Sequence, residues 1–242
     1  VGTYLLAWTV TDGDFSTNAQ VQIAVEHPSP IVELIPSNSQ WKYLDNGSNQ
    51  GTSWKEPAFN DSQWKSGYGI FGYGDGIETT TISYGPVSTS KYITSYFRKQ
   101  FTVSNTNNIT ALTVKLLRDD GAIVYLNGAE VLRDNMPAGT VHYLTTALNV
   151  VSGADESTYF SFVIPPDSLV EGNNVIAVEL HQANGNGTDA GFDMELTANI
   201  HNINQPPAVS AGTNFTIRLP REATLNGIVT DDGFPLTPGF PE

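Results

Sequence analysis

The sequence contains no cysteine, which excludes disulfide frameworks, thiolate zinc sites and cysteine nucleophiles together. Basic residues are also scarce: 11 lysines and arginines stand against 25 acidic residues, for a formal net charge of −14, and they form no cluster. Nucleic acid and anionic membranes are therefore not expected as partners. No run approaches the roughly 18 apolar residues of a membrane span, so we expect no membrane insertion.

A turn-rich chain without disulfides is typical of an exported bacterial protein, so we expect a secreted or extracellular location, free or at a cell surface. The surplus of carboxylates is compatible with calcium, whose ligands are oxygens. It is equally compatible with a charge that only keeps an exported protein soluble.

Hydrophobic residues make up 39% of the 242 residues and aromatic residues 10%, enough for a real core, whereas charged residues make up only 15%. Alternating apolar residues predict strands through the middle of the chain, and Asn127-Gly128 is the strongest hairpin signal. Roughly eight strands in this part favour an all-β, antiparallel jelly-roll β-sandwich. The clearest predicted strands are 94–103, 111–117, 121–132, 158–165, 173–182 and 191–200.

The two ends of the chain are separated from the middle by proline-containing segments and have a different sequence pattern. Residues 1–27 form a predicted hairpin, closed by "PSP" at 28–30, and "NQPP" at 204–207 marks a second break. The end segments "GTYLLAWTVTDGDFSTNAQVQIAV" and "PPAVSAGTNFTIRLPREATLNGIVTDDG" resemble the closing and opening parts of PKD or related bacterial Ig-like repeats. We therefore expect three regions: 1–27, 28–203 and 204–242. A lone hairpin buries little, so we expect the ends to pair, within one chain or between neighbouring chains.

The middle region resembles the galactose-binding-like sandwich of secreted bacterial proteins and of β-galactosidase-type accessory domains. The resemblance rests on "WKYLDNGSNQGTSW", "LRDDGAIVYLNGAEVL", "NNVIAVELHQ" and "FDMEL" in this order. It implies the sandwich fold, while the function stays open because the fold carries both sugar binders and structural units.

The same resemblance implies a structural calcium between residues 41–54 and the last strand. In relatives, an Asp and a Thr before a Trp hold the ion with nearby carbonyls, and a closing Glu completes the site. The matching residues here are Asp45, Asn49, Thr52, the Met194 carbonyl and Glu195. Hard oxygens of this kind suit calcium. The alternative is an Asx-rich turn without metal. Trp41 and Trp54 are expected in the core rather than on a ligand.

Residues 67–85 carry glycines and tyrosines without apolar alternation, which predicts a long surface loop. Aromatic rings there could stack on the C–H faces of sugars, with a carboxylate accepting hydroxyl hydrogen bonds. The alternative is an Ω-loop packed by its own rings. The candidate ligand-binding residues are Tyr68, Phe71, Tyr73, Asp75 and Tyr84.

Three further residues are candidates at the rims of the predicted strands. Asp119 and Asp120, in "RDDG", could hold a second cation, bind hydroxyls or cap a turn, with Asp120 as the candidate ligand residue. Arg133 and Asp134 follow the partner strand toward the same end. His181, two residues after Glu179, is expected to hydrogen-bond on the concave face and to touch ligand. No nucleophile elbow, phosphate loop or zinc pattern appears, so we expect no catalysis in this chain.

The sequence thus favours a non-catalytic carbohydrate-binding module with a structural calcium, in a secreted multidomain protein. Its expected partners are a polysaccharide or glycan and the neighbouring domains of the polypeptide. One rival is a structural or adhesive spacer, in which the rings of residues 67–85 would turn inward. Another is an accessory domain of a hydrolase, which would expose a large apolar patch.

Overall fold

The computed structural model describes residues 2–11, 16–25, 31–201, 208–210 and 228–230. The chain divides into two compact units, one of Val1–Pro30 with His201–Glu242 and one of Ile31–Ile200. Within the described residues, none lies in a helix long and apolar enough to cross a membrane.

The first unit contains two separate strand pairs. The predicted N-terminal hairpin is present: β1 (Gly2–Thr11) and β2 (Ser16–Val25) are antiparallel along their whole length. Near the other end, β15 (Ala208–Ser210) pairs with β16 (Ile228–Thr230). Most of the segment that resembles the opening of an Ig-like repeat lies outside the described residues, and the pairing of the two ends stays a prediction.

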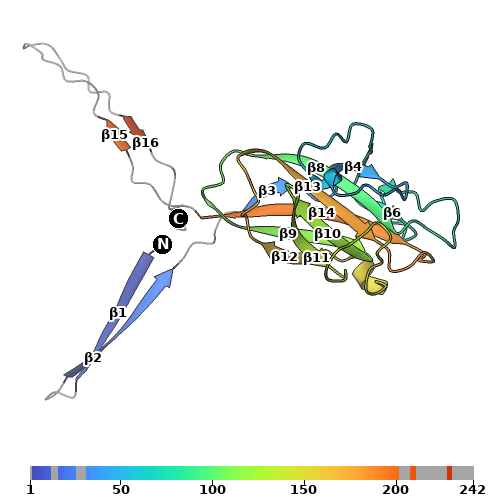
Figure 1. Ribbon diagram of the computed structural model, residues 1–242. Helices are drawn as coiled ribbons and strands as arrows, with labels where there is room; N and C mark the ends of the chain where they lie inside the picture. Colours follow the sequence, from blue (N-terminus) through green and yellow to red (C-terminus); the bar gives the residue numbers. More distant parts are fainter. Residues whose placement is uncertain (1, 12–15, 26–30, 202–207, 211–227, 231–242) are drawn as a thin grey trace, which may run out of the picture. The chain divides into compact units, whose positions relative to one another are not determined.

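The second unit is a sandwich of two sheets, which confirms the predicted all-β antiparallel class (Figure 1). The first sheet has the order β11-β10-β13-β8-β4-β5, and the second has the order β12-β9-β14-β6-β7, with β3 also paired to β14. From β8 to β14 the chain crosses repeatedly between the sheets, which is the wrapping of a jelly roll. One pair, β6 with β7, is parallel. The strands of the first sheet are β4 (Gln40–Leu44), β5 (Lys65–Tyr68), β8 (Thr94–Val103), β10 (Gly121–Leu126), β11 (Ala129–Asp134) and β13 (Gly172–His181). Those of the second are β3 (Ile31–Ile35), β6 (Phe71–Tyr73), β7 (Thr80–Thr81), β9 (Ile109–Asp119), β12 (Phe160–Ile164) and β14 (Ala190–Ile200).

Two short 3-10 helices are the helical elements among the described residues: η1 (Ser53–Lys55) and η2 (Gly153–Ser157). Residues 57–64, between η1 and β5, form hydrogen-bonded turns. The predicted hairpin between β10 and β11 is present, and both Asn127 (φ 50°) and Gly128 (φ 89°) adopt the left-handed conformation that such a turn requires.

The main core lies between the sheets, and it is built by the alternation that the sequence shows. Phe97 of β8, Val114 of β9 and Val178 of β13 are all fully buried in it. Trp41 also belongs to this core, where its ring meets Phe192 edge to face at 5.3 Å.

A second buried cluster covers the outer face of the first sheet, so that β10 and most of β13 are buried on both faces. We call it the outer aromatic cluster. It is formed by Trp54, Trp64, Tyr96, Ile123, Tyr125, Met136, Ala147 and Ala177. Strands of the first sheet therefore present residues to two cores, one on each face, and the second core positions the site described next.

Candidate functional site

A cavity of about 350 Å³ opens in the outer aromatic cluster on the first sheet. A cavity of this size is typical of small-ligand sites, which are concave and lined by aromatic side chains with a few polar groups. We call it the ring-walled pocket. Its lining comes from residues 49–55, residues 139–143 and four strands of the first sheet, β8, β10, β11 and β13. It comprises Asn49, Gly51, Thr52, Trp54, Lys55, Tyr96, Tyr125, Glu130, Arg133, Gly139, Thr140, Val141, His142, Tyr143 and Glu179.

Strand alternation and η1 place the rings of the pocket. Tyr96 and Tyr125 face outward because their neighbours Phe97 and Val124 face the main core. Trp54, on η1, lies between the two tyrosines, with its ring centre 4.8 Å from that of Tyr96 and 5.7 Å from that of Tyr125, edge to face in both cases. The rings therefore hold one another in place before any ligand arrives.

Polar groups of the pocket are already paired. The Tyr125 hydroxyl donates to Glu179 Oε1 at 2.6 Å, and burial, followed by the nearby Glu179 charge, raises the pKa of Tyr125 above its usual range. Arg133 donates to both carboxylate oxygens of Glu130 at 2.8 Å, which lowers the pKa of Glu130. Lys55 Nζ lies 4.1 Å from the centre of the Tyr125 ring. The pocket thus offers charged donors and acceptors in fixed positions.

His181 lies behind the pocket and is fully buried, so it does not face a ligand. Its Nδ1 is 2.7 Å from the Thr145 carbonyl oxygen, which only accepts, so Nδ1 carries the proton and donates. Nε2 lies 3.2 Å from Glu179 Oε2. The imidazole is therefore held by hydrogen bonds at Nδ1 behind the pocket, and of the predicted rim residues Arg133 alone lines the pocket.

Residues 41–54 form one lip of this pocket. Asn49 makes an Asx turn by accepting from Gly51 N at 2.9 Å, and Asn49, Thr52 and Trp54 all line the cavity. Trp54 is 2% exposed, as expected for a core residue, but it also forms a pocket wall. The loop therefore combines an Asx turn with the edge of a candidate ligand site.

The residues predicted to hold calcium are distributed over both sheets. Asp45 follows β4 and accepts from Lys65 Nζ at 2.7 and 2.9 Å and from Ser83 N at 2.7 Å. Glu195 lies on β14, where it pairs with Lys115 at 2.8 Å, and the side chain of Met194 is buried in the main core. A cation at Asp45 would have to displace the Lys65 ammonium, so these side chains as they stand do not fit it. Calcium at this set stays a prediction.

The expectation of an irregular surface loop over residues 67–85 is wrong in part, because β6 and β7 lie within it. Pairing with β14 turns Phe71 and Tyr73 into the main core between the sheets, and neither ring lines the ring-walled pocket. Tyr68 and Tyr84 remain exposed, and Asp75 is half-buried in a group of acids. No ring cluster accessible to ligand is formed by these predicted residues.

Asp120 is an anchor for two surface segments. One of its carboxylate oxygens accepts from Val151 N at 2.6 Å and the other from Ala183 N at 2.7 Å. This matches the turn-capping alternative more closely than hydroxyl binding, because both oxygens are already occupied by backbone donors.

The apolar surface of the second unit has one notable concentration. Leu144, Leu148 and Val150, each at least 60% exposed, occur within seven residues beside the pocket-lining segment 139–143. The other exposed large apolar side chains of the described residues come from several separate segments.

Part of the pocket is recognisable from the sequence, but Tyr143 is not. Tyr96, Tyr125 and Glu179 lie at the outward positions of predicted strands, and large or charged residues there indicate a covered or functional face. Tyr143 belongs to a segment without periodicity, and its place over the sheet depends on long-range contacts such as Thr94 Oγ1 donating to its carbonyl oxygen at 2.8 Å.

No protein-family model and no curated protein sequence matches this chain. Among solved structures, it is similar to a β-glycosidase from Bacteroides vulgatus (18% identity, TM-score 0.42, 70% of this chain and 20% of that chain). It is also similar to a β-glucuronidase from Bacteroides uniformis (18%, TM-score 0.46, 70% and 18%) and to one from an uncultured Clostridium species (12%, TM-score 0.44, 86% and 35%). The chain spans about a fifth to a third of the length of these enzymes, and likeness at this level carries no argument about its ligand.

Proposed function

We propose that the unit Ile31–Ile200 is a non-catalytic carbohydrate-binding module that holds a polysaccharide or glycan in the ring-walled pocket. The observation that carries the proposal is the pocket itself: a cavity of about 350 Å³ lined by four aromatic rings and four charged side chains. The rings are those of Trp54, Tyr96, Tyr125 and Tyr143, and the charged side chains are Lys55, Glu130, Arg133 and Glu179.

This combination suits a polyhydroxylated ligand. Ring faces can cover the C–H surface of a pyranose, while Glu179 and Arg133 accept from and donate to its hydroxyls. The rings and polar groups already contact one another, so little side-chain freedom is lost on binding. We expect a dissociation constant of about 10 µM to 1 mM per site.

The wider setting is part of the proposal. The absence of cysteine and the resemblance of both ends to Ig-like repeats support a secreted multidomain protein in which this unit is one module. Weak binding per site would then be reinforced by other modules of the polypeptide through effective concentration.

A retention experiment tests the proposal. The full 242-residue chain is applied to a glycan array and to insoluble polysaccharides, with Tyr143→Ala as the pocket variant and Tyr68→Ala as the matched exposed-tyrosine control. We expect retention on one glycan class, at least tenfold weaker binding by Tyr143→Ala, and none or little change in Tyr68→Ala. Failure of the folded wild-type chain to bind any glycan would favour the structural spacer. Loss confined to Tyr68→Ala would move the site to residues 67–85.

A further inference from the structure

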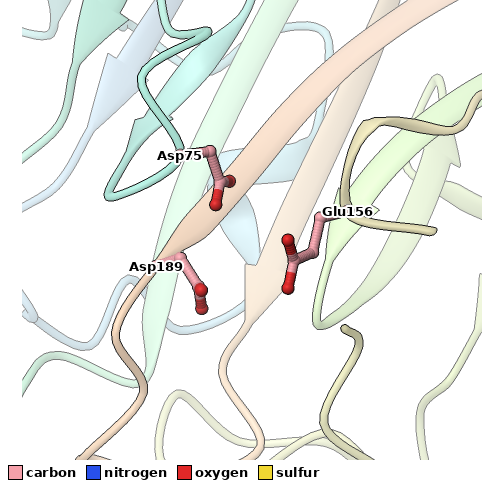
Figure 2. A group of neighbouring side chains, drawn as sticks. All are labelled: Asp75, Glu156 and Asp189. Atoms are coloured by element: carbon pink, nitrogen blue, oxygen red, sulfur yellow. The ribbon is translucent and has the colours of Figure 1, made fainter. Parts of the chain in front are cut away.

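A group of acidic side chains lies on the second sheet, apart from the residues that line the pocket. Asp75, Glu156 and Asp189 each offer a carboxylate oxygen, and the three oxygens lie within 4.8 Å of one another. Figure 2 shows these side chains gathered around one space from three different segments of the chain. Together with Asp119, discussed next, we call them the acidic cluster.

The order of strands explains why these acids meet. Asp119 ends β9, Asp189 directly precedes β14 and Asp75 follows β6 by two residues. The three strands are neighbours in the order β9-β14-β6. Glu156 comes from η2, which packs against β9. Residues far apart in the sequence are thus delivered to one edge of one sheet.

Gly191 lets the segments that carry these residues approach closely. It pairs with Asp119 across the strands, so both share one face of the sheet, and Asp189 lies two residues away along the chain. A Cβ built on Gly191 would lie 3.1 Å from Leu117 Cδ2, 3.7 Å from Asp119 Cβ and 3.7 Å from the Glu156 carbonyl oxygen. The absence of a side chain at Gly191 therefore brings β9 and the Glu156 segment close to the start of β14.

Asp119 is the independent sign that something is missing from the acidic cluster. Its side chain is 1% exposed, yet neither carboxylate oxygen accepts a hydrogen bond within residues 31–200. The next residue, Asp120, is equally buried and has both oxygens satisfied. Buried carboxylates normally have partners, because desolvation without one is costly. The Tyr73 hydroxyl, also buried, has no partner either.

Positive charge is lacking around the acidic cluster. Within the part of the chain that the structure describes, none of its four carboxylates takes part in an ion pair. Burial, Asp120 and the charges of Asp189 and Asp75 raise the pKa of Asp119 to about 9. Burial and the neighbouring carboxylates raise that of Asp75 to about 6. A bound cation would relieve the same repulsion.

We propose that Asp75, Asp119, Glu156 and Asp189 bind one calcium ion at the edge of the second sheet. Calcium takes about six to eight oxygens at about 2.3–2.6 Å, so ligand oxygens on one ion lie at most about 5 Å apart, a condition that Asp75, Glu156 and Asp189 meet. Asp119 is the fourth ligand of the proposal because it pairs with Gly191, two residues after Asp189, and is buried without a partner. Four carboxylates without histidine or cysteine disfavour zinc. Magnesium typically uses only one or two carboxylates and keeps its waters.

This site differs from the predicted calcium set and does not rest on carbohydrate binding. It shares no residue with Asp45 or Glu195, or with the lining of the ring-walled pocket. An ion here would join the end of β9, the start of β14, the segment after β6 and η2. Without disulfides, such a cross-link fastens surface segments to the sheet.

Calcium titration of the full chain, stripped with chelator, tests the site by calorimetry and thermal unfolding. We expect one ion per chain, and a rise in melting temperature of roughly 5–10 °C at a hundredfold excess over the dissociation constant. Asp189→Asn and Glu156→Gln should each weaken calcium binding at least tenfold. Asp155→Asn is the matched control, because it removes the charge of an exposed carboxylate next to Glu156 on η2. This variant should bind calcium as the wild type does.

Two results would overturn the proposal. One is no heat and no thermal shift with millimolar calcium in the folded wild-type chain. The other is full binding by both Asp189→Asn and Glu156→Gln. If Glu195→Gln alone abolished binding, the ion would belong to the predicted set at Asp45 and Glu195 instead. Glu156 is half-buried, so Glu156→Gln keeps the test open if Asp189→Asn fails to fold.

Discussion

The ring-walled pocket and the acidic cluster lie on different sheets, and they differ in whether their buried polar groups have partners. In the pocket, Tyr125 donates to Glu179 at 2.6 Å and Arg133 pairs with both oxygens of Glu130. In the acidic cluster, both oxygens of Asp119 lack donors. One site is complete without a ligand, and the other lacks a counter-charge.

This difference predicts two kinds of selectivity. A site whose polar groups are already satisfied pays little to reorganise and selects by shape and hydrogen-bond pattern. A site of unneutralised carboxylates selects by charge and by the number of oxygens that an ion requires. Substitutions should therefore separate glycan binding from calcium binding, and the following tests ask whether they do.

The largest effect is expected from Arg98→Leu, which removes the buried cation beneath the pocket wall. Arg98 is 1% exposed; its Nε pairs with Asp61 at 2.9 Å, and its guanidinium donates to the backbone carbonyls of Trp54 and Glu56. Leucine would leave these acceptors unpaired and free η1. We expect the free energy of unfolding, measured by chemical denaturation, to fall by about 3–5 kcal/mol. Glycan retention should be lost as well.

Lys99→Leu, at the neighbouring half-buried position, is the control for Arg98→Leu, because Lys99 Nζ makes only an exposed hydrogen bond to the Gln40 carbonyl. The free energy of unfolding of Lys99→Leu is expected to fall by less than about 1 kcal/mol. Equal losses for both variants would show that the pocket wall does not depend on the Arg98 network.

The next effect is a pH-dependent gain from Asp119→Asn in the presence of chelator. The raised pKa of about 9 means that folded Asp119 keeps its proton while the unfolded residue, near 4, loses it. The stability that this group contributes is present below about pH 4 and is lost as pH rises toward 9. Asparagine cannot ionise, so Asp119→Asn should be more stable than the wild type by a few kcal/mol at pH 8, with little difference at pH 4.

Calcium should make the wild type the more stable of the two proteins, because the wild type binds the ion more tightly than Asp119→Asn does. Melting temperatures of both proteins at pH 8, first with chelator and then with calcium, test this reversal. If Asp119→Asn were less stable than the wild type in chelator as well, Asp119 would have a structural partner, and the contrast between the two sites would fail.

Much of the sandwich could be predicted because its strands carry their burial pattern locally. The predicted strand 94–103 has the observed bounds of β8, and Asn127-Gly128 marks the hairpin between β10 and β11. The inward residues of β9 and β13 also followed from period-two alternation. A strand that is amphipathic by itself needs no partner to be recognised.

Residues 67–85 show where this reasoning fails. Gly72 pairs with Gly191, and a Cβ on Gly72 would lie 1.9 Å from the Ala190 carbonyl oxygen. Gly72 allows the backbones of β6 and β14 to approach closely, whereas in the sequence the same glycine is typical of a loop. The strand is recognisable only once its partner, more than a hundred residues later, is known.

The acidic cluster is predictable only in part, for a similar reason. Asp119 and Asp120 are adjacent and indistinguishable in the sequence, so both are candidates for a cation, and nothing in the sequence joins them to Asp75, Glu156 and Asp189. The structure gives Asp120 two backbone donors and gives Asp119 none. Which carboxylate is left unpaired depends on the register of β9 with β14, and that register is a long-range property.

A smaller effect, on ligand binding rather than stability, is expected from Glu179→Gln. The amide oxygen can still accept from Tyr125, but the charge available to a ligand hydroxyl is lost, and charged hydrogen bonds are the stronger kind. We expect about tenfold weaker glycan binding by calorimetry, with calcium binding unchanged. Glu156→Gln should do the reverse. If either substitution impaired both ligands, the two sites would be coupled rather than independent.

The smallest effect is expected from Lys55→Met at the rim of the pocket. Lys55 lines the pocket, with its Nζ 4.1 Å from the centre of the Tyr125 ring. Methionine keeps the length of the side chain but removes a charged donor that can bind a ligand hydroxyl, so glycan affinity should fall by about two- to fivefold. Lys115→Met, which breaks the surface pair with Glu195 on the other sheet, should leave affinity unchanged. Equal losses in Lys55→Met and Lys115→Met would mean that the glycan responds to the net charge of the chain, so the ring-walled pocket, like the acidic cluster, would select by charge.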